Sequence, residues 1–144
     1  MKFVRNSEKK KLLKDMEMYG IKKLPYLLLE AGKEKVRGFS GTMNKEEFAE
    51  LEEIARVEIV GLYLIRKEKG GLRLGLDGSM MLKPSRNVIE IDAINEWMKG
   101  HDLEVKGNNG LYAVKHRGDF LGCGALKDGK LINYIPKERR IRLN

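Results

Sequence analysis

Hydrophobic positions in the first 56 residues alternate between helical and strand-like spacing. Leu12, Leu13, Met16 and Tyr19 recur at helical intervals, so we expect a helix that Ser7 caps and Gly20 ends. A second amphipathic helix is expected over 45–56, capped by Thr42 or Asn44, with its glutamates in water. Strands are expected at residues 3–4, 26–30 and 35–39. This part therefore predicts a small α/β unit.

From residue 57 the pattern changes to short strand-like runs separated by glycine turns. The expected strands are 58–66, 72–76, 88–91, 103–105, 111–116, 120–126 and 130–135. A helical turn is expected at 77–82, and a helix capped by Asp92 should end at Gly100. Evenly spaced short strands are typical of a small, closed or nearly closed β-barrel. We therefore expect an α+β fold with two parts, 1–56 and 57–144.

The charge balance favours a polyanionic partner. The 144 residues hold 29 Lys and Arg against 21 Asp and Glu, a net charge of +8. An excess of positive charge is typical of proteins that bind nucleic acid. The absence of glutamine beside abundant Lys and Glu fits a heat-adapted source.

Targeting and redox signals are absent from the sequence. No run approaches the roughly 18 apolar residues of a membrane helix, and the first residues lack the apolar stretch of a secretory signal. A single cysteine makes no internal disulfide. We expect a soluble, cytoplasmic protein.

Motifs for catalysis, metals and cofactors are also missing. His101, His116 and Cys123 have no metal-ligand spacing, and no phosphate-binding glycine loop is present. Cys123 lies between two glycines in an apolar run, which indicates a buried packing residue. A Cys123–His116 pair stays open as an alternative. We expect no enzyme activity, no catalytic residue, no metal site and no cofactor.

The C-terminal segment carries the clearest functional signal. Residues 130–142 hold five cations and one acid. Arginine suits bidentate phosphate contacts, and Tyr134 is able to stack on a base or to fill the barrel mouth. Lys115 and Arg117 add charge of the same sign on the preceding hairpin.

Several stretches of this half resemble a known domain. They are 107–115 (GNNGLYAVK), 118–124 (GDFLGCG), 128–137 (DGKLINYIPK), the Arg139-Arg140-Ile141 ending, and the helix and turn at 95–102 (NEWMKGHD). Together they are similar to the C-terminal PUA-type domain of the Sun (Fmu) family of RNA 5-methylcytosine methyltransferases. Ile132 stands where that family usually has lysine, which removes one expected cation.

The resemblance implies a PUA-like β-barrel at 57–144 preceded by an α/β pre-domain at 1–56. The family's catalytic domain is missing, so the resemblance implies an RNA-binding protein of ribosome-biogenesis type that recognises structured RNA, rRNA or tRNA. The alternative is a protein–protein adaptor that docks on a separate RNA methyltransferase or ribosomal factor. The expected RNA-binding residues are Lys83, Arg86, Lys99, Gly100, His101, Lys115, Arg117, Tyr134, Lys137, Arg139 and Arg140.

Overall fold

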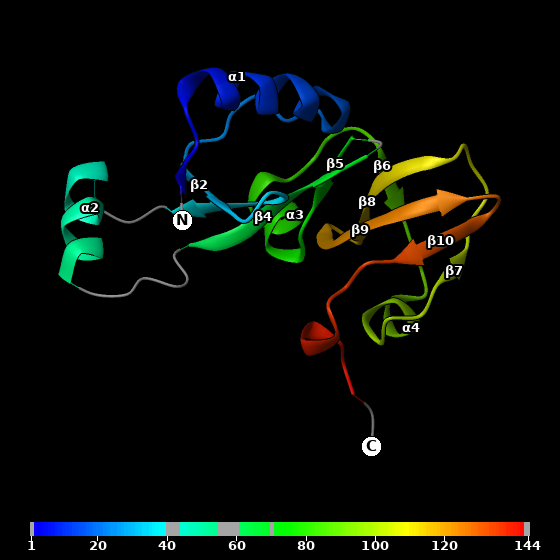
Figure 1. The fold of residues 1–144 in the computed structure, drawn as a ribbon. Coiled ribbons are helices and arrows are strands. Elements are labelled where there is room, and N and C mark those ends of the chain that lie inside the picture. Colours follow the sequence, from blue (N-terminus) through cyan, green and yellow to red (C-terminus); the bar gives the residue numbers. More distant parts are fainter. Residues whose placement is uncertain (1, 40–43, 55–60, 70, 143–144) are drawn as a thin grey trace.

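A five-stranded antiparallel sheet forms the first half of the fold (Figure 1). The computed structural model describes residues 2–39, 44–54, 61–69 and 71–142. The strands follow chain order across the sheet: β1 (Lys2–Phe3), β2 (Leu27–Ala31), β3 (Lys35–Phe39), β4 (Leu62–Glu68) and β5 (Gly71–Leu74). The β2–β3 hairpin runs from Leu27 opposite Phe39 to Ala31 opposite Lys35.

Helix α1 (Asn6–Asp15) and the 3-10 turn η1 (Met16–Tyr19) cover one face of this sheet (Figure 1). Met16 and Tyr19 are fully buried there, and the Tyr19 hydroxyl donates to the Leu72 carbonyl at 2.6 Å. Gly20 ends η1 in the left-handed conformation, as expected. The expected cap is wrong: Arg5 precedes the helix, Ser7 lies inside it, and no side chain caps it.

Helix α2 (Lys45–Ile54) lies beside the edge of the sheet, where Phe48 packs edge-on against Phe3 with ring centroids 5.2 Å apart. The Asn44 side chain accepts from the Glu47 amide at 2.8 Å, which confirms Asn44 as its cap. The other candidate, Thr42, and positions 55–56 of the expected helix lie outside the described residues.

A second five-stranded sheet forms the C-terminal half. Its strands lie in the order β6 (Val88–Glu90), β8 (Gly110–His116), β9 (Asp119–Lys127), β10 (Lys130–Asn133) and β7 (Leu103–Glu104). Among the strand pairs of the described residues, β6 and β8 alone run parallel, and α4 and β7 lie in the crossover connection that such pairing needs. Helix α4 (Ile94–Met98) follows Ala93 with no side-chain cap, so the expected Asp92 cap is wrong.

Helix α3 (Leu76–Leu82) packs against β4 on one side and β9 on the other, and so joins the two sheets. Residues of both sheets share one hydrophobic core, in which Ala113 and Cys123 lie with Val36, Ile65 and Leu74. A second core surrounds the fully buried Trp97. Met80 and Met81 of α3 stay exposed, at 43% and 44%.

The predicted α+β class is confirmed by these two sheets and the helices that pack on them. The predicted boundary between residues 56 and 57 lies outside the described residues. The first sheet contains strands from both sides of that position, since β3 pairs with β4. The division into 1–56 and 57–144 therefore stays a prediction. Within the described ranges no helix is long and apolar enough to span a lipid bilayer.

Candidate functional site

A buried asparagine holds the turn after α4 against the end of β10. The Asn133 side-chain amide donates to the carbonyls of Trp97 at 2.7 Å and His101 at 3.1 Å, and its oxygen accepts from the Ile135 amide at 2.8 Å. The Trp97 indole in turn donates to the Leu121 carbonyl at 2.9 Å. These bonds hold the turn in place, because breaking them would leave the buried polar groups of Asn133 and Trp97 without partners.

The turn carries three of the expected RNA-binding residues. Lys99 and His101 both contact Glu96, at 3.4 and 2.6 Å, and their hydrogen bonds, His101 foremost, hold the pKa of Glu96 below its usual value. Gly100 has φ +93°, and the Arg140 side chain lies directly over it. A Cβ atom at residue 100 would come within 2.4 Å of Arg140 Nε, so glycine is required for this approach.

The segment after β10 crosses from this turn toward the first sheet. The Arg140 Nε donates to the Ile135 carbonyl at 3.0 Å, and the Ile141 amide donates to the Met98 carbonyl at 2.8 Å. Lys137 begins the exposed turn η2 (Lys137–Arg139). Lys99, Gly100, His101, Lys137 and Arg140 thus lie at one end of the second sheet, and we call them the turn cluster.

Two further expected residues point elsewhere, Arg139 to helix α3 and Tyr134 to strand β5 of the first sheet. The Arg139 guanidinium makes a bidentate pair with Asp77 at 3.0 and 3.1 Å, and this hydrogen bonding raises the pKa of Arg139 above its usual value. The Arg73 guanidinium lies 4.0 Å from the centre of the Tyr134 ring. Arg139 is therefore neutralised locally, whereas Tyr134 stacks with a cation that the sequence reading did not single out.

Tyr134 and Arg139 line a cavity of about 510 Å³ between the first sheet and the C-terminal segment, which we call the intersheet cleft. Sequence reasoning missed its other cations, Lys35, Arg37, Arg66 and Arg73. Their alternation with Val36 and with buried leucines was visible in the sequence and indicates a polar sheet face. Which element faces them was not visible, because it lies far away in the chain.

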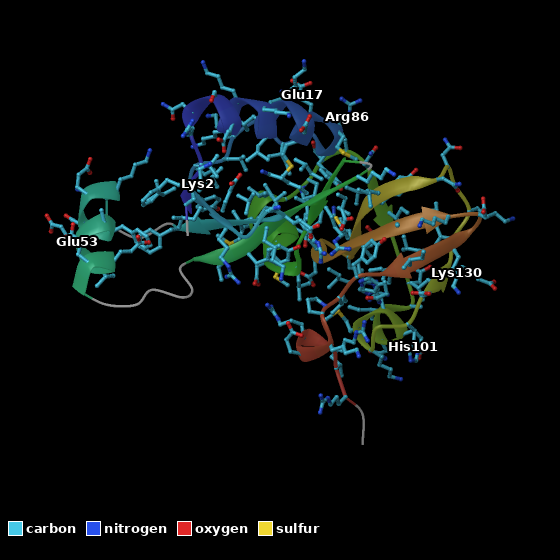
Figure 2. All side chains as sticks on the ribbon, in the orientation of Figure 1. Lys2, Glu17, Glu53, Arg86, His101 and Lys130 are labelled. Carbon is cyan, nitrogen blue, oxygen red and sulfur yellow. The ribbon has the colours of Figure 1, made fainter. Side chains whose placement is uncertain are left out.

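The remaining expected residues lie elsewhere. Lys115 lies in β8, 5.4 Å from the Phe120 ring centre, and Arg117 lies in the β8–β9 turn, where its amide donates to Glu90 at 2.7 Å. Arg86 lies beside Glu17 of η1, far from His101 (Figure 2). Lys83 is the residue at which α3 ends, three positions before Arg86 in the chain. The structure does not bring Lys83 and Arg86 to the turn cluster, and their part in binding stays a prediction.

The possible nucleophile is inert in this setting. Cys123 is 2% exposed, its thiol contacts the Tyr19 hydroxyl at 3.9 Å, and burial raises its pKa to about 11. His116 Nδ1 instead bonds to the Ile91 carbonyl at 2.6 Å. A buried, protonated thiol is a poor nucleophile. Among the residues with described structure, no group of three or more His, Cys, Asp or Glu is placed to hold a metal.

Comparison with known proteins locates the family relationship in the C-terminal half. A family model described as the methyltransferase RsmF PUA domain matches residues 86–141. A solved structure described as a conserved PUA domain protein from Thermoplasma acidophilum superposes with a TM-score of 0.59 at 19% identity, covering 92% of this chain and 80% of that one. No curated protein matches the chain. Residues 86–141 are thus similar to the PUA domain of the RsmF methyltransferase, and the fold of the chain resembles that of a PUA domain protein, as predicted.

Proposed function

We propose that this protein is a non-catalytic, cytoplasmic RNA-binding protein that recognises structured RNA, rRNA or tRNA, in support of ribosome biogenesis or RNA modification. The turn cluster supplies the main contacts. The observation that carries the proposal is the close approach of Arg140 to Gly100 beside Lys99 and His101, inside the segment that matches the PUA domain.

The turn cluster suits phosphate binding on physical grounds. The Arg140 side chain is held over the Lys99–His101 turn, because its Nε donates to the Ile135 carbonyl and the Ile141 amide donates to the Met98 carbonyl, so this side chain has little freedom to lose on binding. The Glu96 carboxylate partly neutralises Lys99 and His101, so the turn cluster has a lower affinity for a simple polyanion than its cations alone would give. Contacts to phosphates position a protein on RNA, and RNA helices are recognised mainly by shape and backbone.

The test is the salt dependence of RNA binding, measured by fluorescence anisotropy with a labelled tRNA or rRNA fragment. A plot of log K against log salt has a negative slope, and each phosphate contact that is lost makes this slope less steep by about 1. We expect Lys99→Ala and Lys137→Ala each to weaken binding and to reduce the slope by about that amount. Lys10→Ala, an exposed lysine on α1, is the matched control and leaves both unchanged.

Equal affinity for RNA and for heparin, with slopes that the turn-cluster variants do not change, would overturn the proposal. The adaptor alternative has a separate signature. A methyltransferase or ribosomal factor that stays bound to the protein after ribonuclease treatment of a cell extract would favour docking over RNA binding.

A further inference from the structure

The intersheet cleft is built from both halves of the chain. Strands β3, β4 and β5, the start of α3, strand β9 and the segment after β10 line it. Its volume of about 510 Å³ falls within the range of small-ligand sites. It lies on the face of the first sheet opposite α1, because Val36 packs in the core under α1 while Lys35 and Arg37 point the other way.

Positive charge dominates the lining. Five cations, Lys35, Arg37, Arg66, Arg73 and Arg139, line the cleft against two carboxylates, Asp77 and Glu138. The Arg139–Asp77 pair cancels one cation, as described above. Glu34 and Glu68 pair with Arg66 and Arg73 from outside the lining, so the five cations face four carboxylates in all, and the small positive excess that remains favours an anion.

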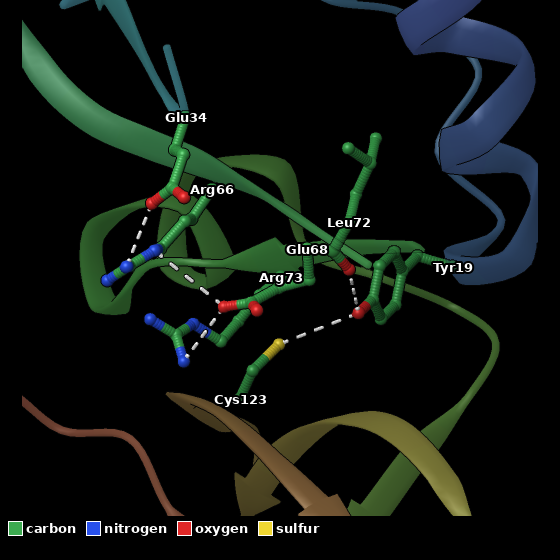
Figure 3. Close-up of polar contacts among 7 residues, drawn as sticks. All are labelled: Tyr19, Glu34, Arg66, Glu68, Leu72, Arg73 and Cys123. Atoms are coloured by element: carbon green, nitrogen blue, oxygen red, sulfur yellow. Dashed lines mark hydrogen bonds and ion pairs between the residues drawn. The ribbon is translucent and has the colours of Figure 1, made fainter. Parts of the chain in front are cut away.

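A network of carboxylates behind the lining fixes two of the arginines (Figure 3). Glu68 contacts Arg66 at 3.7 Å and Arg73 at 3.1 Å, and Glu34 holds the other end of the Arg66 guanidinium at 2.9 Å. Arg66 Nε is buried and has no hydrogen-bond partner among the described residues. Held guanidinium groups lose little entropy when they bind a ligand.

An aromatic platform lies beside these cations. Tyr134 is half-buried and has Arg73 over its ring at 4.0 Å, while Tyr63 lines the same cleft with Lys35 5.4 Å from its ring centre. Unpaired RNA bases stack on tyrosine rings and on arginine planes. A ligand that joins one negative group to one planar ring satisfies both halves of this lining, and a nucleotide is such a ligand.

We propose that the intersheet cleft binds a single unpaired nucleotide of the RNA, with its phosphate on Arg37 and Arg66 and its base against Tyr134 and Arg73. This inference rests on the proposed function, since it adds a second contact to an RNA held by the turn cluster. The first sheet thereby becomes part of the RNA-binding surface. An acidic peptide would satisfy the cations and leave the aromatic platform unused, so the nucleotide is favoured.

The experiment compares two RNA hairpins with the same stem, one blunt and one with an unpaired extension, in anisotropy titrations against the full chain. We expect the wild type to bind the extended hairpin about tenfold more tightly, as one stacked and phosphate-bound nucleotide should give. In Tyr134→Ala and in Arg37→Gln the two hairpins should bind with nearly equal affinity. Arg5→Gln, the same charge change at the start of α1, keeps the tenfold difference.

Urea unfolding of each variant verifies that it is folded, and Arg37→Gln serves as the main variant should Tyr134→Ala unfold. A wild type that does not distinguish the hairpins, or an advantage that persists in Arg37→Gln, overturns the nucleotide site. Competition by inorganic phosphate as strong as that by a nucleoside monophosphate also overturns it, as does Arg37-dependent binding of an acidic peptide in place of the extension. A wild-type protein that binds neither hairpin would instead refute the proposed function.

Discussion

Cys123 shows how burial dominates the chemistry of a residue, because it outweighs the hydrogen bonds and the nearby Arg73 that would lower the pKa of the thiol. The sequence predicts a packing role from its two glycine neighbours and its apolar run, and the structure confirms that it is buried. Its pKa of about 11 leaves roughly one thiolate per thousand molecules at about pH 8, and a thiol in unfolded protein titrates near 8.5.

We expect native Cys123 to react with a disulfide reagent at about pH 8 far more slowly than the unfolded chain does. The rate in the native protein should rise about tenfold per pH unit as the thiolate fraction grows, up to about pH 11. The measurement is the absorbance change with and without guanidinium. Fast reaction of the native protein would show that the thiol is accessible and would reopen a nucleophilic role.

Asn133 was predictable only as a member of the motif that resembles the methyltransferase domain. Its side chain bonds to residues 36 and 32 positions away, Trp97 and His101, and no local pattern encodes such partners. In isolation an asparagine near a proline reads as a turn residue. Lys35 and Arg37 escaped notice for the same reason, because charge on a strand reads as an ordinary solvated face until the facing segment is known.

At the scale of elements, α3 approaches β4 closely enough to exclude a side chain. A Cβ atom at Gly78 would come within 2.0 Å of the Leu64 carbonyl oxygen, which is backbone and has little room to shift. Glycine inside a helix otherwise costs about 0.5–1 kcal/mol relative to alanine. Glycine at position 78 therefore lowers helix propensity but allows α3 to pack closely against β4.

Gly78→Ala should lower the free energy of unfolding by about 2–3 kcal/mol, because overpacking outweighs the gain in helix propensity. Gly32→Ala is the control: it has φ +73° but open space around its Cβ position, so left-handed strain alone should cost about 1 kcal/mol. Urea unfolding measures both. A Gly78→Ala protein as stable as the wild type would show that α3 moves away from β4 without cost.

Element boundaries were predictable where the determining contact is local. Gly20 and Asn44 act within one turn of their own position, and both behave as expected. Ser7 and Asp92 carry the right side chain for a cap and yet do not cap, because α1 and α4 each begin at a different residue from the one expected. Strand β4 belongs to the first sheet because it pairs with β3, and β5 because it pairs with β4, and a strand pattern alone specifies neither pairing.

For the whole molecule, the shared core makes the two sheets depend on each other. Val36 and Tyr19, both before residue 57, pack in one cluster with Ala113 and Cys123 of the second sheet. Strand β4 would lose its neighbour β3 if the chain were divided at the predicted boundary. Both features favour a single cooperative unit.

We expect the full chain to unfold in a single calorimetric transition, and a fragment of residues 57–144 to lack a cooperative one. Removing residues 1–56 takes away α1, η1 and β1–β3 and exposes the buried leucines of β5 to water. Calorimetry of both proteins is the measurement. A fragment that unfolds as sharply as the full chain would establish the predicted division as a true domain boundary.

The two exposed methionines of α3 make the protein suitable for oxidative footprinting. Thioether oxidation to the sulfoxide depends on access, so Met80 and Met81 would be labelled readily, whereas the fully buried Met16 serves as an internal standard in the same digest. Mass spectrometry of the protein with and without ligand would then report coverage of this helix with no engineered probe.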